Sequence, residues 1–142
     1  MLKVLIYEVL LVAVTVTGQN YVTRECFDCI CEASTGCNIN QGCNTYCGPY
    51  LISYAYWIET DQPGRTGNKN LYDDFTSCVK KKECAEETIQ SYMKIWAKNC
   101  VKNKEINCND VARIHKTGRN GCNGTWFEST QYWRLFQDCY IL

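Results

Sequence analysis

Few residue types in this sequence could carry out catalysis by the common routes. The chain has a single histidine, His115, so it cannot build a metal site from several imidazoles. A lone histidine more often packs or caps near a helix end than serves as a general base. The sequence contains neither a G-x-S-x-G nucleophile elbow nor a glycine-rich phosphate loop. Any chemistry must therefore come from the cysteines, the carboxylates or the aromatic side chains.

The cysteines favour covalent cross-linking over catalysis or metal binding. Their number is even and their density is high, which is typical of a disulfide framework in a secreted domain. The spacing Cys26-x-x-Cys29 also fits a zinc site, but oxidation in the secretory pathway would remove the thiolates that zinc needs. The twelve cysteines are Cys26, Cys29, Cys31, Cys37, Cys43, Cys47, Cys78, Cys84, Cys100, Cys108, Cys122 and Cys139.

Twelve cysteines allow about ten thousand pairings, so the connectivity cannot be derived from the sequence. Local bridges are expected between the cysteines that lie close together, and the remaining ones must join distant segments. The expected local pairs are Cys31 with Cys37, Cys43 with Cys47, and Cys78 with Cys84.

The aromatic residues have two interpretations. Most of the ten tyrosines and four tryptophans should lie in the core, because a small secreted domain needs bulky apolar side chains. Those in the segment from Tyr50 to Trp57 could instead line a groove and stack on sugar rings, because such side chains combine an apolar body with a polar tip.

The N-terminus predicts secretion. Residues 1–18 combine Lys3, an apolar stretch interrupted only by Glu8, and small residues before Gln19, the pattern of a cleavable signal peptide. The apolar stretch is shorter than the about 20 residues that span a bilayer, so we expect no membrane attachment after cleavage. Residues 19–142 then form one domain by length. Fifteen basic and fifteen acidic residues balance, which argues against a nucleic-acid partner.

The elements that would position these residues are mainly helices. Periodic apolar residues, with acids early and lysines late, predict helices over 70–82 and 85–99. A shorter helix is expected over 109–116, with Asn109 as its N-cap and Gly118 near its end, and another over 126–139. Residues 50–59 are expected to be strand or extended loop, and 60–69 a turn-rich loop. The fold class is therefore α+β and mostly α.

Motifs along nearly the whole mature chain resemble the invertebrate-type lysozymes, a family that includes leech destabilase. The most specific is Cys26-x-x-Cys29-Ile30-Cys31-Glu32-Ala33-x-x-Gly36-Cys37. Further matches follow in the same order: Cys47-Gly48-x-Tyr50-x-Ile52, Ala55-Tyr56-Trp57, Cys84, Ile89-Gln90-x-Tyr92-Met93, Ala112-Arg113-Ile114-His115, Gly121-Cys122 and Tyr132-Trp133. The resemblance implies a disulfide-rich lysozyme-like fold with a helical bundle, a short β region and a cleft between them.

The resemblance also implies hydrolysis of the β-1,4 glycosidic bonds of peptidoglycan, for antibacterial defence or digestion. This reaction needs one protonated and one ionised carboxyl group. Ser34 occupies the position of the family's glutamate acid, and the loop between Cys43 and Cys47 holds no acid where the family has its aspartate. We therefore expect weak or absent catalysis.

Two acids are fallback candidates for catalysis, Glu32 and Glu59. In a helix Glu32 would be rotated by about 200° from Ser34, and a solvated or capping role is favoured for it. The alternatives to a glycan-binding protein are an active muramidase that uses other acids and a destabilase-like isopeptidase with a serine–lysine pair.

The expected ligand is peptidoglycan or a related amino-sugar glycan, with no cofactor and no metal, and the protein should be a monomer. The sequon Asn123-Gly124-Thr125 predicts a surface N-glycan. The residues expected to bind substrate are Tyr50, Leu51, Ile52, Tyr54, Trp57, Tyr92 and His115.

Overall fold

The computed structural model describes residues 20–67 and 70–141. The expected signal peptide lies outside these residues. The elements in chain order are α1 (Arg24–Thr35), β1 (Tyr46–Cys47), β2 (Ile52–Ser53), α2 (Tyr54–Ile58), α3 (Leu71–Val79), α4 (Lys82–Cys100), α5 (Cys108–Gly121), the 3-10 helix η1 (Trp126–Ser129) and α6 (Gln131–Cys139). The α+β, mostly helical fold class is confirmed.

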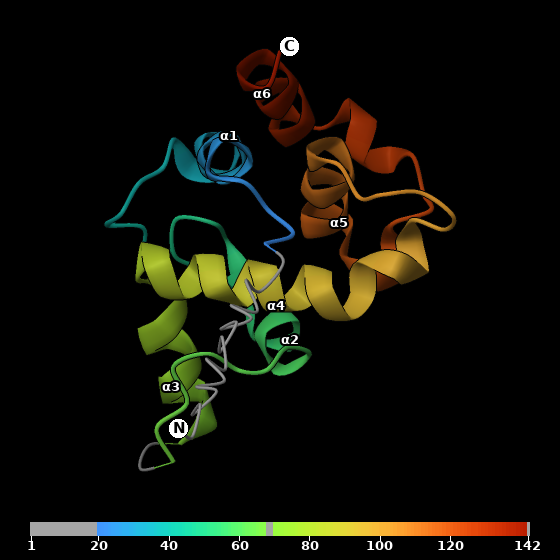
Figure 1. The fold of residues 1–142 in the computed structure, drawn as a ribbon. Helices are drawn as coiled ribbons and strands as arrows, with labels where there is room; N and C mark the ends of the chain where they lie inside the picture. The colour runs from blue at the N-terminus through green and yellow to red at the C-terminus, as the bar shows by residue number, and fades with distance from the viewer. Residues whose placement is uncertain (1–19, 68–69, 142) are drawn as a thin grey trace, which may run out of the picture.

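Helix α4 is the central element of the fold. It crosses the middle of Figure 1, with α1, α5 and α6 on one side and α2 and α3 on the other. Ala85, Ile89, Met93 and Ala97 recur every fourth residue and all four are 0% exposed. This spacing places them on one face of the helix, which packs into the core.

The β region is small and lies beside the C-terminal end of α1. Strands β1 and β2 form one antiparallel pair, with Tyr46 opposite Ser53 and Cys47 opposite Ile52. Thr35 at the end of α1 donates a hydrogen bond from its hydroxyl to the Pro49 carbonyl at 2.7 Å, which ties the helix to the loop between the strands.

The prediction of an extended segment over 50–59 was half wrong. Ile52–Ser53 is a strand, but Tyr54–Ile58 forms the helix α2. The Ser53 side chain accepts a hydrogen bond from the Tyr56 amide and so caps this helix. Aromatic residues fit strands and short buried helices equally well, so the composition of the segment could not separate the two.

The helix boundaries also differ from those predicted. Helix α5 begins at Cys108 and is capped by Asn107, whose side chain forms a capping box with Asp110, so Asn109 is not the cap. The predicted helix over 126–139 is divided into η1 and α6, because Thr130 is extended and caps α6 through the Trp133 amide. Helix α1 was not predicted at all.

Six disulfides cross-link the chain, and they confirm the three local pairs expected. Two others join segments far apart in sequence, since Cys26 pairs with Cys108 and Cys29 pairs with Cys139. They hold α1 to the start of α5 and to the end of α6. The full set is Cys26–Cys108, Cys29–Cys139, Cys31–Cys37, Cys43–Cys47, Cys78–Cys84 and Cys100–Cys122.

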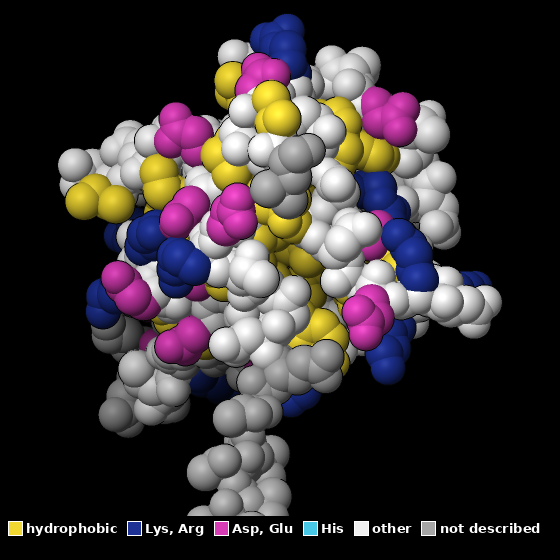
Figure 2. All heavy atoms as spheres, turned by 45° about the horizontal axis from the view of Figure 1, so that its top comes forward, with side chains coloured by type: hydrophobic (Ala, Val, Ile, Leu, Met, Phe, Trp, Pro, Cys, Tyr) yellow, Lys and Arg dark blue, Asp and Glu magenta, His cyan; other side chains and the backbone are white. Residues whose placement is uncertain are grey.

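The surface mixes charges of both signs. On the face shown in Figure 2, basic and acidic side chains are interspersed, with apolar side chains between them. Within residues 20–67 and 70–141, no helix is both long and apolar enough to cross a bilayer.

Candidate functional site

Two adjoining hollows lie where α1, the β region, α5 and α6 meet. They share four lining residues, Ala33, Ser34, Lys116 and Tyr132, and together we call them the groove. The first hollow has a volume of about 200 Å³ and is also lined by Tyr46, Tyr50, Leu51, His115 and Trp126. The second has a volume of about 370 Å³ and is also lined by Glu32, Thr35, Gly36, Thr130, Gln131 and Leu135.

Ser34 lies in the last turn of α1 and lines both hollows. Its hydroxyl donates a hydrogen bond to the Ile30 carbonyl of the same helix at 2.8 Å. The helix ends at Gly36, whose left-handed backbone (φ 66°) a glycine adopts without strain. The position that the resemblance assigns to the catalytic acid therefore carries a hydroxyl group bonded to its own helix.

The second expected acid position is a tight loop closed by the Cys43–Cys47 disulfide. The loop contains Asn44, Thr45 and Tyr46, none of which can ionise as a carboxylate. Tyr46 lines the first hollow and is 57% exposed. This loop contributes an aromatic ring to the groove instead of a charge.

Of the two fallback acids, only Glu32 lines the groove. Among the described residues it is the one carboxylate in the lining of either hollow, and it is exposed. The helical rotation keeps Glu32 out of the first hollow, although it shares the second with Ser34. Glu59 lines neither hollow and forms an ion pair with Arg119 at 3.0 Å.

His115 is held in one protonation state by its neighbours. Its Nε2 lies 2.8 Å from the Tyr50 carbonyl, which can only accept, so Nε2 carries the proton. Nδ1 can then accept from the Tyr56 hydroxyl at 3.3 Å. Burial lowers the pKa of His115 to about 4. His115 is neutral at physiological pH, with both nitrogens engaged, so it supports the groove as a structural contact.

Tyr50 is positioned by a charged network beneath the groove. Its hydroxyl donates to Glu86 at 2.7 Å, and Arg24 donates two hydrogen bonds to the same carboxylate, each at 2.6 Å. Burial opposes ionisation of Glu86, but the hydrogen bonds from Arg24 and Tyr50 lower its pKa below the usual value. The Tyr50 ring is thus fixed at its hydroxyl by α4 and at its backbone by His115 of α5.

Three of the seven predicted binding residues line the groove: Tyr50, Leu51 and His115. The other four line neither hollow. Trp57, for example, is 0% exposed and donates its indole N–H to the Pro63 carbonyl at 3.1 Å. These side chains serve the core, as the first interpretation of the aromatic residues expected. The four are Ile52, Tyr54, Trp57 and Tyr92.

Several lining residues were not predicted from the sequence, among them the exposed residues Tyr46, Lys116 and Trp126. Trp126 begins η1 directly after the small and polar residues of the sequon, and a tryptophan in such a context was the available signal. Asn123 of the sequon is exposed, and its glycosylation stays a prediction.

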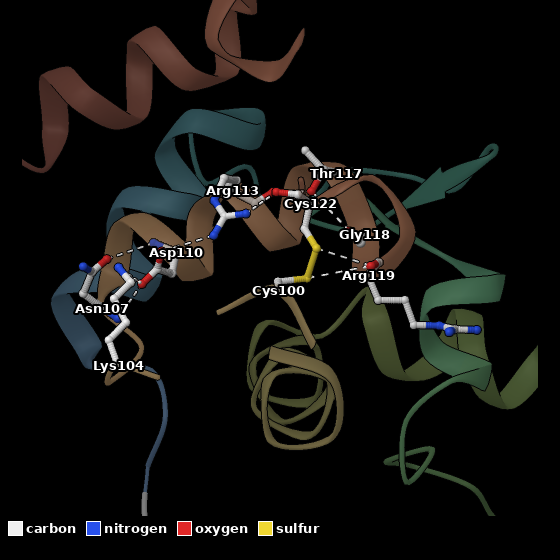
Figure 3. A network of polar contacts seen from close by, with 9 residues as sticks. All are labelled: Cys100, Lys104, Asn107, Asp110, Arg113, Thr117, Gly118, Arg119 and Cys122. Atoms are coloured by element: carbon white, nitrogen blue, oxygen red, sulfur yellow. Dashed lines mark hydrogen bonds and ion pairs between the residues drawn. A yellow bond between two sulfur atoms is a disulfide. The ribbon is translucent and has the colours of Figure 1, made fainter. Parts of the chain in front are cut away.

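The C-terminal half of α5 is braced by the contacts in Figure 3. Arg113 donates to the Cys122 carbonyl and to Asp110 at 3.2 Å. Beyond Lys116, the helix kinks at Gly118, where φ is 71° and ψ is 171°. The kink brings the chain back so that Cys122 bonds to Cys100 of α4. These contacts fix the end of α5 that carries His115 and Lys116.

No residues within the described part of the chain form a cluster of three or more histidine, cysteine or acidic groups suited to a metal ion. All twelve cysteines are paired in disulfides. Besides the neutral His115 and the amide of Gln131, the lining of the groove consists of hydroxyl, aromatic and aliphatic groups, with one cation, Lys116, and one carboxylate, Glu32.

Comparisons with known proteins agree on one family. The family model described as Destabilase matches residues 23–139. A protein of Ruditapes philippinarum named invertebrate-type lysozyme is 31% identical over 82% of this chain and 80% of its own length. A lysozyme of Meretrix lusoria is 32% identical over 82% of this chain and 88% of its own. The crystal structure of Tapes japonica lysozyme superimposes with a TM-score of 0.69 at 28% identity, covering 87% of this chain and 98% of that one.

Proposed function

The chain belongs to the destabilase family, whose members include invertebrate-type lysozymes, and from this premise we propose that it binds peptidoglycan in the groove with weak or absent hydrolysis. The ligand of the groove is a chain of amino sugars from peptidoglycan or a related glycan. The protein acts as a secreted monomer without a cofactor. Its six disulfides, the signal-peptide pattern and the sequon support secretion.

The observation that carries the proposal is the identity of the group at Ser34. Glycoside hydrolysis needs a carboxylic acid that protonates the leaving oxygen and a second carboxylate about 5 Å away in a retaining enzyme. A serine hydroxyl is far too weak an acid to replace the first, and its hydrogen bond to the Ile30 carbonyl occupies its proton. Loss of a positioned acid costs about 10²- to 10⁴-fold in rate.

The position expected for the second carboxylate holds no acid either, and the one carboxylate of the groove, Glu32, lines only the second hollow. The Cys43–Cys47 loop supplies Tyr46 where an ionised group would stabilise the positive charge that develops on the sugar. Without either group, the binding surface can persist while the chemical step does not.

The test compares binding with hydrolysis on purified insoluble peptidoglycan, using the oxidised protein. We expect the wild type to sediment with peptidoglycan and to release no reducing ends above background. The Ser34→Glu variant restores an acid but not the second carboxylate, so it should also release few reducing ends. A Ser34→Ala variant is the control, because it changes the same position without adding a charge, and it should bind as the wild type does.

Clear release of reducing ends by the wild type would contradict the proposal. It would favour the second candidate function, an active muramidase, for which Glu32 is the specific support because it lines the second hollow. Glu32→Gln should then abolish the activity.

An isopeptidase is the third candidate, because Ser34 and Lys116 line the same two hollows. The Ser34 hydroxyl donates to a backbone carbonyl, however, and forms no hydrogen bond with Lys116. Hydrolysis of a γ-glutamyl-lysine isopeptide that Ser34→Ala abolishes would support this candidate.

A further inference from the structure

The lining of the first hollow of the groove carries a net positive charge. Lys116 is the one charged side chain in its lining, and the acid at the far end of the groove, Glu32, lines only the second hollow. A hollow with one cation and no carboxylate favours a ligand that carries a negative charge.

Lys116 has no acidic partner of its own. It is exposed, and none of the ion pairs among the described residues includes it. Its ammonium group lies 5.4 Å from the centre of the Tyr132 ring, which lines both hollows. The cation is therefore held at the groove by an aromatic face, while its charge stays available to an anion.

Two aromatic rings are exposed beside this cation. Tyr46 is 57% exposed and Trp126 is 53% exposed, whereas Tyr50 of the same hollow is fully buried. They come from separate segments, β1 and η1. Large apolar surface left in water at a hollow is typical of a binding site, and flat rings offer stacking surfaces for the apolar faces of sugar rings.

We propose that Lys116 is the specificity-determining residue of the groove, and that its ammonium group binds the carboxylate of an acidic amino sugar whose ring lies against Tyr46 and Trp126. This inference rests on the proposed function, because it assumes that amino sugars occupy the groove. Muramic acid carries such a carboxylate on its lactyl group wherever no stem peptide is attached, whereas the N-acetylglucosamine of chitin carries none. The groove should therefore distinguish peptide-free glycan that contains muramic acid from neutral chitin.

The experiment measures the affinity for two probes of equal length by calorimetry. One is a neutral tetramer of N-acetylglucosamine, and the other is a peptide-free tetramer in which muramic acid, with its lactyl carboxylate free, alternates with N-acetylglucosamine. We expect the wild type to bind the acidic probe about 3- to 10-fold more tightly, the range of one charge-assisted contact. Lys116→Gln should abolish this preference by weakening the binding of the acidic probe more than that of the neutral one, and Lys116→Arg should retain it.

Matched controls separate the groove from the rest of the surface. Lys102→Gln removes an exposed lysine that lines neither hollow, and it should leave the preference unchanged. Tyr46→Ala or Trp126→Ala should lower the affinity for both probes about 3- to 10-fold. Tyr72→Ala removes a ring that is 48% exposed on α3, outside the groove, and it should lower the affinity for neither probe.

The outcomes are distinguishable. A wild type that binds both probes equally, or a Lys116→Gln variant that keeps the preference, would overturn the role of Lys116 while leaving glycan binding intact. A wild type that binds neither probe and does not sediment with peptidoglycan would refute the proposed function, and with it this inference.

Discussion

The protonation state of His115 links the geometry of the groove to pH. His115 holds the Tyr50 carbonyl through Nε2–H and accepts from Tyr56 through Nδ1. Protonation of Nδ1 would replace an acceptor by a donor, so the Tyr56 hydroxyl would have to change from donor to acceptor, and it would place a positive charge in a buried site. The groove wall therefore depends on the neutral imidazole.

This dependence gives a prediction at the scale of one residue. The pKa of His115 falls from 6.5 to about 4 on folding, so the unfolded chain takes up the proton first. The contribution of His115 to the free energy of unfolding should be fully present above pH 6.5 and should decrease as pH falls toward 4, by about 3 kcal/mol in all. His115→Gln cannot take up this proton, so its melting temperature should depend less on pH than that of the wild type between pH 6.5 and 5.

Two buried carboxyl groups, Glu86 and Asp110, affect stability over a lower range of pH than His115 does. The pKa values of Glu86 and Asp110 are lowered below 4.5 and 3.8 by hydrogen bonds that outweigh burial. Their contribution is present above those values and is lost only at more acidic pH. If His115→Gln showed the same pH slope as the wild type between pH 6.5 and 5, the assigned protonation state would be wrong.

At the scale of one element, the kink in α5 depends on a glycine. Gly118 has φ 71° and ψ 171°, a region that residues with a Cβ rarely occupy. A Cβ at Gly118 would meet only the Tyr92 hydroxyl, at 3.7 Å, so space is not the limitation. Gly118→Ala should lower the free energy of unfolding by about 1–3 kcal/mol through backbone strain alone, as measured by denaturant unfolding.

Gly121 is the matched control in the same helix. Its backbone has no positive φ, and a Cβ there would lie 3.5 Å from Thr117, an ordinary contact. Gly121→Ala should be neutral or slightly stabilising, because alanine reduces the freedom of the unfolded chain. Equal effects of the two substitutions would show that the kink is not set by backbone strain at Gly118.

The elements show what periodicity could and could not predict. The core face of α4 was predictable because its apolar residues follow the helical period and its charges suit the dipole. The start of α5 was misplaced, since Asn107 and Asn109 are both good caps and only the partner Asp110 selects the first. Helix α1 was not predicted, because the cysteines that dominate its segment indicate disulfides and not a helix, although Thr23 is a standard N-cap.

At the scale of the whole molecule, two disulfides cross-link the same two regions of the chain. Cys26–Cys108 and Cys29–Cys139 both fasten α1 to the C-terminal part of the chain. With either one present, the other closes a much shorter covalent loop than its sequence separation suggests. Their contributions to stability should therefore overlap.

Replacing each pair of cysteines by serine tests this overlap. Removing either bridge alone should cost about 2–4 kcal/mol, and removing both should cost more than the sum of the single losses. The Cys43–Cys47 bridge closes only a short loop, and its removal should be the mildest and additive with either of the others. Strict additivity of the two long-range bridges in denaturant unfolding would contradict their cross-linking of the same two regions.

The groove itself could be predicted only in part. The serine at the position that the resemblance assigns to the acid was visible in the sequence, because a single residue type at position 34 determines it. The lining was not, because Tyr46, Lys116 and Trp126 come from three elements that only tertiary packing brings together. Trp57 and Tyr92 were expected in the groove because the sequence cannot show which rings the core needs.

The two long-range bridges also affect how the molecule responds to proteases. Arg65 is exposed in the turn-rich loop between α2 and α3, a natural position for trypsin-like cleavage. A cut there would separate all the cysteines up to Cys47 from all those after it. Cys26–Cys108 and Cys29–Cys139 would still connect the halves, so a nicked molecule would remain one covalent particle, with α1 against α6 and its groove still assembled, until a reductant reached it.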